Sequence, residues 1–158
     1  MEEVIIQSVI RSCKLEELDE KERQLVEAAI KATGNSYAPY SNFHVGSAVL
    51  LENSAIVIGC NQENAAFPVT LCAERTALFS AGAQYPDVPV VSIAIAARNS
   101  EGLVPDPVTP CGSCRQALVE AEQRFKRRIR VLLYGTKRVF VVDGISNLLP
   151  LSFTDGQM

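Results

Sequence analysis

Three cysteines and one glutamate stand at spacings that suit metal-assisted hydrolysis. One residue separates Cys72 from Glu74, and two residues separate Cys111 from Cys114. Thiolates are good zinc ligands, and zinc in proteins usually takes four ligands in a tetrahedron. Three protein ligands leave the fourth position for water, which is typical of a catalytic rather than a structural site. A carboxylate two residues from a ligand is well placed to move protons to and from that water.

Both groups of cysteines are expected at the N-termini of helices. One helix is predicted over 72–81 and another over 110–124, because Pro110 suits a first turn and Thr109 can cap it. The two cysteines of the second helix are three residues apart, so their Cβ atoms lie on one face, roughly 5–6 Å apart. The helix dipole at such a position favours a thiolate and lowers the cysteine pKa.

Arg75 directly follows the Cys-x-Glu triplet. Three thiolates around one divalent cation leave a net charge of minus one, and an electron-rich zinc acidifies water less strongly. An arginine that donates hydrogen bonds to the ligand sulfurs withdraws charge and restores Lewis acidity. A surface position is the ordinary interpretation of a lone helical arginine, but the place of Arg75 beside Cys72 and Glu74 favours a metal-tuning role.

Composition limits the class of protein. The 158 residues are expected to form one domain, 1–158, with 1–14 as an N-terminal arm or extra strand. A hydrophobic content of 47% excludes disorder, and a formal charge of −3 argues against a nucleic-acid partner. The sequence shows no basic leader and no apolar run long enough to span a bilayer, and its five cysteines are an odd number. We therefore expect a cytoplasmic protein with no membrane partner.

Apolar periodicity predicts an α/β fold. Strand–helix–strand units dominate the second half, which favours a mixed sheet covered by helices on both faces. The expected helices are 18–33, 72–81 and 110–124; the expected strands are 45–51, 55–60, 90–97, 129–134 and 139–142; and 3–11 is either a strand or an ordered arm.

Other conspicuous residues have ordinary explanations. His44, the only histidine, is expected to be a partly exposed strand residue rather than a ligand. The basic run from Arg124 to Arg130 is better explained by cations at a helix C-terminus than by a nucleic-acid patch. Cys13 and Cys60 are predicted to be small buried hydrophobic residues.

Several motifs, taken together, resemble those of the small cytidine deaminases. The matching stretches are Tyr-Ala-Pro-Tyr-Ser-x-Phe-x-Val-Gly at 37–46, Gly-Cys-Asn-x-Glu-Asn-Ala-Ala at 59–66, Cys-Ala-Glu-Arg-Thr-Ala at 72–77, Pro-Cys-Gly-x-Cys-Arg-Gln at 110–116 and Leu-Leu-Pro at 148–150. Cys-x-Glu followed by Pro-Cys-x-x-Cys is the signature of zinc nucleobase deaminases, here with cysteine in place of the histidine that often comes first. The resemblance runs in order from about residue 18 to residue 153.

This resemblance implies a fold and an activity. The implied fold is a three-layer α/β/α sandwich with a mixed five-stranded sheet. The implied activity is the hydrolytic deamination of cytidine and 2′-deoxycytidine to uridine and 2′-deoxyuridine with release of ammonia, as in pyrimidine salvage. The resemblance further implies one zinc ion per chain, a nucleoside as substrate, and a homotetramer with shared active sites.

The resemblance also assigns roles to individual positions. The implied residues are the zinc ligands Cys72, Cys111 and Cys114; the proton shuttle Glu74; the ribose-binding pair Asn61 and Glu63; and substrate contacts at Phe43, Phe67, Ala73 and Phe153. Phe153 matches an aromatic residue that is donated to the site of a neighbouring subunit. Phe67 stands where many relatives have tyrosine, so any hydrogen bond from that phenol is missing here.

Three alternatives stay open. A related deaminase would act on a nucleotide, a guanine-type base or RNA, although Glu63 and the acidic balance oppose a phosphate. A non-enzymatic zinc module would need a fourth thiolate, from Cys13 or Cys60. A redox protein would form a reversible disulfide between Cys111 and Cys114, which leaves Cys72 without a role.

Overall fold

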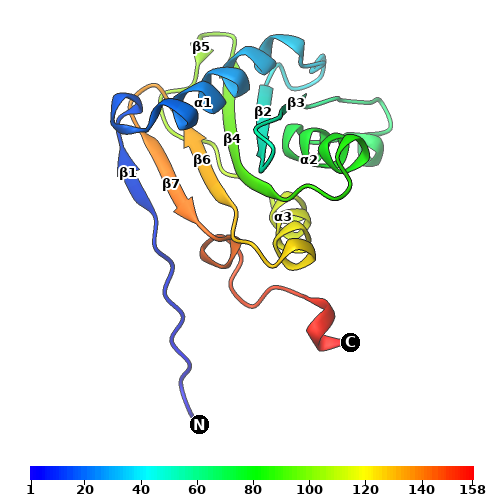
Figure 1. Ribbon diagram of the computed structural model, residues 1–158. Helices are drawn as coiled ribbons and strands as arrows, with labels where there is room; N and C mark the ends of the chain where they lie inside the picture. The colour runs from blue at the N-terminus through cyan, green and yellow to red at the C-terminus, as the bar shows by residue number, and fades with distance from the viewer.

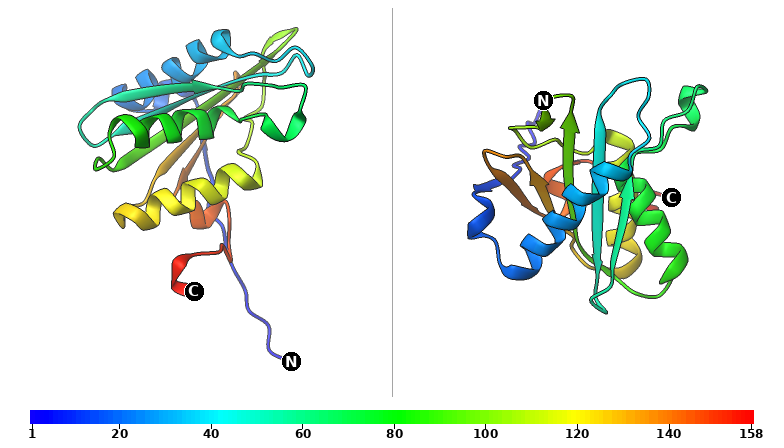
Figure 2. Two further views of the ribbon diagram at one scale, coloured as in Figure 1. Left: turned by 90° about the vertical axis from the view of Figure 1, so that its right-hand side faces the viewer. Right: turned by 90° about the horizontal axis from the view of Figure 1, so that it is seen from above.

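The structure is a computed structural model that describes residues 1–158. Its helices are α1 (Glu20–Ala32), α2 (Ala73–Gln84) and α3 (Gly112–Phe125), and its strands are β1 (Arg11–Cys13), β2 (His44–Leu51), β3 (Ile56–Cys60), β4 (Val90–Asn99), β5 (Gly102–Leu103), β6 (Arg130–Tyr134) and β7 (Val139–Asp143). Helix α1 covers one face of the sheet, and α2 and α3 lie together on the other (Figure 1, Figure 2). This arrangement confirms the predicted three layers.

The sheet is mixed, as predicted. Its order is β1-β7-β6-β4-β2-β3, and β5 pairs with β4. Strands β4 and β6 pair in parallel, while every other pair is antiparallel. The sheet has seven strands rather than five, because two short strands, β1 and β5, add to the five expected ones. The parallel pair carries the crossover through α3, which brings the second group of cysteines to the same side as α2.

The start of α1 follows the rules for helix capping. Asp19 is the N-cap and accepts a hydrogen bond from the backbone N–H of Glu22 at 2.9 Å, while the Glu22 side chain reaches back to the N–H of Asp19. Leu25, Val26 and Ala29 are buried against the sheet. The helix therefore occupies most of the predicted range 18–33.

Two glycines allow the helices to approach the sheet closely. A Cβ atom on Gly46 would lie 2.1 Å from the carbonyl oxygen of Ala29 in α1. A Cβ atom on Gly59 would lie 2.3 Å from the backbone nitrogen of Ala77 and 2.7 Å from the oxygen of Ala73, both in α2. Because no side chain fits in either gap, these glycines set the depth at which α1 and α2 pack.

The predicted starts of the two cysteine helices need one correction. Cys72 is the N-cap of α2, so the start of the predicted helix 72–81 is one residue early. In α3, however, Cys111 is the N-cap and the helix begins at Gly112, so Pro110 lies outside it and Thr109 does not cap it. The prediction that Pro110 lies in the first turn was wrong, because the backbone stays extended through Cys111.

The first ten residues form neither helix nor strand. Of the stretch 3–11, which was expected to be a strand or an ordered arm, only Arg11 joins the sheet, as the first residue of β1. Val4 and Ile5 are exposed, and Figure 1 shows this arm running away from the body of the molecule. Cys60 is buried as predicted, but Cys13 is only half-buried, because β1 is an edge strand. None of the helices combines the length and apolar character that crossing a bilayer requires.

Candidate metal centre and active site

The N-termini of α2 and α3 bring three sulfurs together. The Sγ atoms of Cys72 and Cys111 are 3.8 Å apart, and those of Cys111 and Cys114 are 3.5 Å apart. All three sulfurs lie within 4.8 Å of one another. A tetrahedron with Zn–S bonds of about 2.3 Å places its sulfurs about 3.8 Å apart. The observed spacing therefore fits zinc, and the structure supports one zinc ion per chain held by these thiolates.

The surroundings of the cluster favour a thiolate. A hydrogen bond from the Cys114 thiol, acting against burial and helped by Arg75, lowers the pKa of Cys72 to about 5. The same hydrogen bond and burial raise the pKa of Cys114. Cys72 thus ionises before Cys114, and a metal ion would have to displace the proton that Cys114 holds.

Arg75 lies beside the cluster, as its position in the sequence indicated. Its Nη2 atom donates to the Sγ of Cys72 at 3.6 Å. Its Nε atom is buried and is the only buried side-chain nitrogen or oxygen without a hydrogen-bond partner. The guanidinium therefore faces the sulfur cluster from a half-buried position, and its metal-tuning role stays a prediction.

Glu74 occupies the first turn of α2 and is 6% exposed. Burial raises the pKa of its carboxyl group, and the nearby charge of Cys72 raises it further. A carboxyl group with a raised pKa, two residues from a metal ligand, can both accept and return a proton near neutral pH.

Asn61 braces the loop that leads into β2. Its Oδ1 accepts from the backbone N–H of Val45 at 2.8 Å and from Ser36 Oγ at 2.5 Å, and its Nδ2 donates to the oxygen of Phe43 at 2.9 Å. One hydrogen of the amide remains for a further acceptor. Asn61 therefore positions Phe43, which is half-buried, and keeps one donor for a ligand.

Glu63 is held by the same loop. Its carboxylate accepts the backbone N–H of Tyr40 at 2.9 Å and of Ser41 at 3.3 Å, together with the Ser41 hydroxyl. These hydrogen bonds, led by that of the Ser41 hydroxyl, lower the pKa of Glu63, so the group is an anion at neutral pH. The roles of Ser36 and Ser41 could not be predicted from the sequence, because a single serine in a loop carries no periodic or spacing signal.

Two of the aromatic candidates, Phe67 and Phe153, are more exposed than Phe43. Phe67 is 69% exposed and packs edge-on against Tyr40, with ring centroids 5.8 Å apart. These two residues, with Ser41, Glu63 and Thr70, line an open pocket of about 360 Å³. Phe153 is 61% exposed on the C-terminal segment. Ala73 is fully buried beneath Gly59, and its role as a substrate contact stays a prediction.

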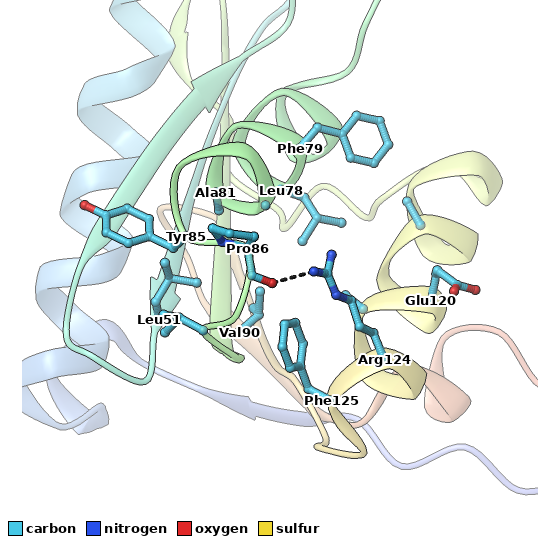
Figure 3. A pocket seen from close by; sticks show the side chains of 14 residues that line it. Leu51, Leu78, Phe79, Ala81, Tyr85, Pro86, Val90, Glu120, Arg124 and Phe125 are labelled. Carbon is cyan, nitrogen blue, oxygen red and sulfur yellow. Dashed lines mark hydrogen bonds between the residues drawn. The ribbon is translucent and has the colours of Figure 1, made fainter.

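A second pocket lies away from this chemistry. A cavity of about 310 Å³ lies between the C-terminal halves of α2 and α3. Figure 3 shows the side chains that line it, which are mainly apolar, such as Leu78 and Phe125. Arg124 crosses its mouth and donates a hydrogen bond to the oxygen of Pro86. None of the predicted site residues lines it.

The remaining cysteines and the histidine stay outside the metal centre. Neither Cys13 nor Cys60 belongs to the sulfur cluster, so the structure offers no fourth thiolate for a structural zinc site. His44 begins β2, opposite Arg98, and is partly exposed as predicted.

Comparison with known proteins gives an independent result. The family model for the "cytidine and deoxycytidylate deaminase zinc-binding region" matches residues 19–129, which contain the whole sulfur cluster and Glu74. The chain is 38% identical over 136 residues to a cytidine deaminase of Halalkalibacterium halodurans, and the match covers 86% of this chain and 96% of that protein. It is 42% identical over 100 residues to a cytidine deaminase of Sporosarcina psychrophila, covering 61% and 67% of the two chains.

Solved structures agree with this match. The fold is similar to that of a cytidine deaminase from Burkholderia pseudomallei, with a TM-score of 0.71, 39% identity, and coverage of 82% of this chain and 97% of that one. A cytidine deaminase from Mycobacterium tuberculosis gives a TM-score of 0.67 at 27% identity, covering 86% and 99%.

Proposed function

The chain belongs to the cytidine and deoxycytidylate deaminase family, and from that premise we propose that it deaminates the free nucleosides cytidine and 2′-deoxycytidine, with a role in pyrimidine salvage. It is a zinc-dependent hydrolase that replaces the amino group at C4 of cytosine by oxygen and releases ammonia. The observation that carries this conclusion is the cluster of three sulfurs beside the buried carboxyl group of Glu74.

The residues of the site divide the reaction between them. Cys72, Cys111 and Cys114 would hold the zinc ion, which would supply the Lewis acidity that makes water a nucleophile at neutral pH. Glu74 takes one proton of the attacking water as the C4–O bond forms and passes it to N3. It then takes the second proton, from the new C4 hydroxyl, and passes it to the amino group, so that the C4–N bond breaks, the C4 carbonyl forms and ammonia leaves. The raised pKa of Glu74 supports both directions of transfer.

Arg75 is proposed to tune the metal. Three thiolates on a divalent ion leave a charge of minus one, which weakens Lewis acidity. The contact between Arg75 Nη2 and Cys72 Sγ, at 3.6 Å, draws charge from one of the ligands.

The loop between α1 and β2 and the turn after β3 are proposed to bind the nucleoside. Phe43 packs on the pyrimidine, Ala73 contacts the substrate from the start of α2, and the free amide hydrogen of Asn61 and the carboxylate of Glu63 bind the sugar hydroxyls. A Glu63 carboxylate kept ionised by Ser41 repels a phosphate at the same place. Cytidine is therefore expected to be turned over with a much higher kcat/KM than cytidine 5′-monophosphate, and similar values would favour a nucleotide deaminase.

The oligomer is proposed to be a homotetramer with shared active sites. Phe67 and Phe153, two aromatic candidates for substrate contact, are both exposed, which leaves their rings free to contact a neighbouring chain and supports this proposal. In the test, Glu74→Ala and Phe153→Ala are unfolded and refolded together. Mixed oligomers contain some sites with both residues intact, so the mixture should exceed the summed activity of the separate preparations. Mixed oligomers without any gain would show that Phe153 serves its own chain.

We also propose a cytoplasmic location. All five cysteines are free, and three of them form the metal cluster, so a reducing compartment would preserve the site.

A direct assay tests the main proposal. Purified protein is mixed with cytidine or 2′-deoxycytidine, the loss of the cytosine absorbance and the release of ammonia are followed, and zinc per chain is measured. The matched control is Glu74→Gln, purified in the same way, which excludes a contaminating deaminase. Wild-type protein with one zinc per chain and no turnover of either nucleoside would refute the proposal.

A further inference from the structure

Arg115 links the second cysteine pair to the C-terminal segment. It directly follows Cys114 in α3, and its Nε donates to the oxygen of Pro110 at 2.8 Å while its Nη1 donates to the oxygen of Leu148 at 2.6 Å. Pro110 is the residue before Cys111, and both Pro110 and Leu148 are buried. One planar guanidinium thus holds the backbone at the metal centre and the backbone at the start of the C-terminal segment in a fixed relation.

The next residue extends this link. Gln116 donates from Nε2 to the oxygen of Phe153 at 2.9 Å. This is the only hydrogen bond between residues 150–158 and the rest of the chain, because the other hydrogen bonds of the segment are local. Figure 2 shows the segment leaving the body of the molecule beside α3. The position of Phe153 therefore depends on a single side chain that lies two residues after Cys114.

We propose that Arg115 and Gln116 are positioning residues that couple the filling of the metal site to the placement of the C-terminal segment. The inference rests on the proposed zinc site. A metal ion that fixes Cys111 and Cys114 also fixes the oxygen of Pro110 and the first turn of α3. That turn presents the guanidinium and the amide to Leu148 and Phe153. Without metal, the sulfur of Cys111 meets that of Cys72 in α2 only through a weak contact, so the turn and the segment anchored to it are fixed less firmly.

Neither side chain takes part in the proton transfers, so the coupling is measured through the position of the segment rather than through turnover. Lysine at position 115 keeps the charge but has a single donor centre on a flexible stem, and it cannot serve both carbonyl oxygens in one rigid geometry. Alanine at position 116 removes only the bond to Phe153 and leaves the helix intact.

The test measures how fast a carboxypeptidase trims the full chain past Phe153, followed by intact-mass spectrometry under reducing conditions. Zinc-loaded and chelator-stripped proteins are compared for the wild type, Arg115→Lys and Gln116→Ala. The matched control is Arg124→Lys, which changes another arginine of α3 whose carbonyl contact, to Pro86, lies away from the segment.

Zinc should slow trimming of the wild type and of Arg124→Lys by about fivefold, the factor that one ordinary hydrogen bond gives. In Arg115→Lys and Gln116→Ala with one zinc per chain, trimming should be as fast as in metal-free protein. The proposal is overturned if zinc does not change trimming of the wild type, or if both variants keep the zinc-dependent protection. Cytidine turnover is recorded separately, so a wild type that shows the coupling without deaminating cytidine would refute the proposed function alone.

Discussion

Gly59 lies under α2, and replacing it by alanine should disturb the metal centre more than the fold. The new Cβ atom would lie 2.3 Å from the backbone nitrogen of Ala77, whereas ordinary contact begins near 3.4 Å, so the helix has to withdraw by about 1 Å. Overpacking of this kind typically costs about 1–3 kcal/mol of folding free energy. A domain of this size usually stays folded after such a loss of folding free energy.

The metal site is less tolerant of the same movement. Cys72 is the N-cap of α2, and its sulfur lies 3.8 Å from that of Cys111 in α3. Ligand distances in metal sites vary by only about 0.2 Å, and a misplacement of about 1 Å can lower a catalytic rate by about 10²-fold. Gly59→Ala should therefore fold, bind less than one zinc per chain and lose most of its turnover.

The assay compares zinc content, cytidine turnover and melting temperature with those of Gly82→Ala. Gly82 lies in the same helix, and a Cβ atom there meets nothing within 4 Å. Alanine is favoured over glycine in a helix by about 1 kcal/mol, so this control should melt at a higher temperature with unchanged turnover. A Gly59→Ala protein with full zinc and wild-type turnover would show that α2 adjusts without moving Cys72, and the reasoning would fail.

Three further predictions concern charged groups. Glu74→Gln should keep zinc and fold but lose about 10²–10⁴-fold in kcat, and retention of more than about a tenth of the activity would contradict its role as proton shuttle. Arg75→Gln should change the pH–rate profile at full zinc occupancy, and an unchanged profile would mean that Arg75 does not tune the metal. Although burial opposes it, the guanidinium groups of Arg130 and Arg11 lower the pKa of Asp143. Its stabilisation is therefore present above the ordinary carboxyl pKa of about 4 and is lost as the pH falls through the lowered value. Because Asp143 is 38% exposed, Asp143→Asn should lower the unfolding free energy at pH 7 by less than about 1 kcal/mol, and a gap that persists at pH 2 would contradict this assignment.

The ligand set could be predicted from the sequence because cysteine spacing is a strong local signal. Cys72, Cys111 and Cys114 converge as expected, since helix N-termini present side chains at known positions. The start of α3 was less predictable. Pro110 and Thr109 have the local preferences of a first turn and a cap, yet the chain stays extended to Cys111.

An extra strand within 1–14 was one of two expectations, but the bounds of β1 and the existence of β5 had no signal of their own. Strand β5 has two residues, and β1 has three, so neither is long enough to show alternation. Both exist because a neighbouring strand leaves backbone groups unpaired, which is a property of the assembled sheet. The loop at 104–107 is similar: Val104 and Pro105 accept hydrogen bonds from the turn between β6 and β7, and no local pattern predicts that partner.

The choice of cysteine at both N-caps connects the fold to the chemistry. An N-cap serine, threonine, aspartate or asparagine stabilises a helix by about 0.5–2 kcal/mol relative to alanine. Cys72 and Cys111 occupy this position without making a side-chain capping bond, so both helices forgo that stabilisation. The unpaired N–H groups of each first turn, and the positive ends of both helix dipoles, are then directed toward the sulfurs. A cluster that must carry three thiolates therefore gains its compensating charge from the backbone of α2 and α3 as well as from Arg75. Each cysteine is thus both a metal ligand and the residue that leaves its helix end free to stabilise the anion.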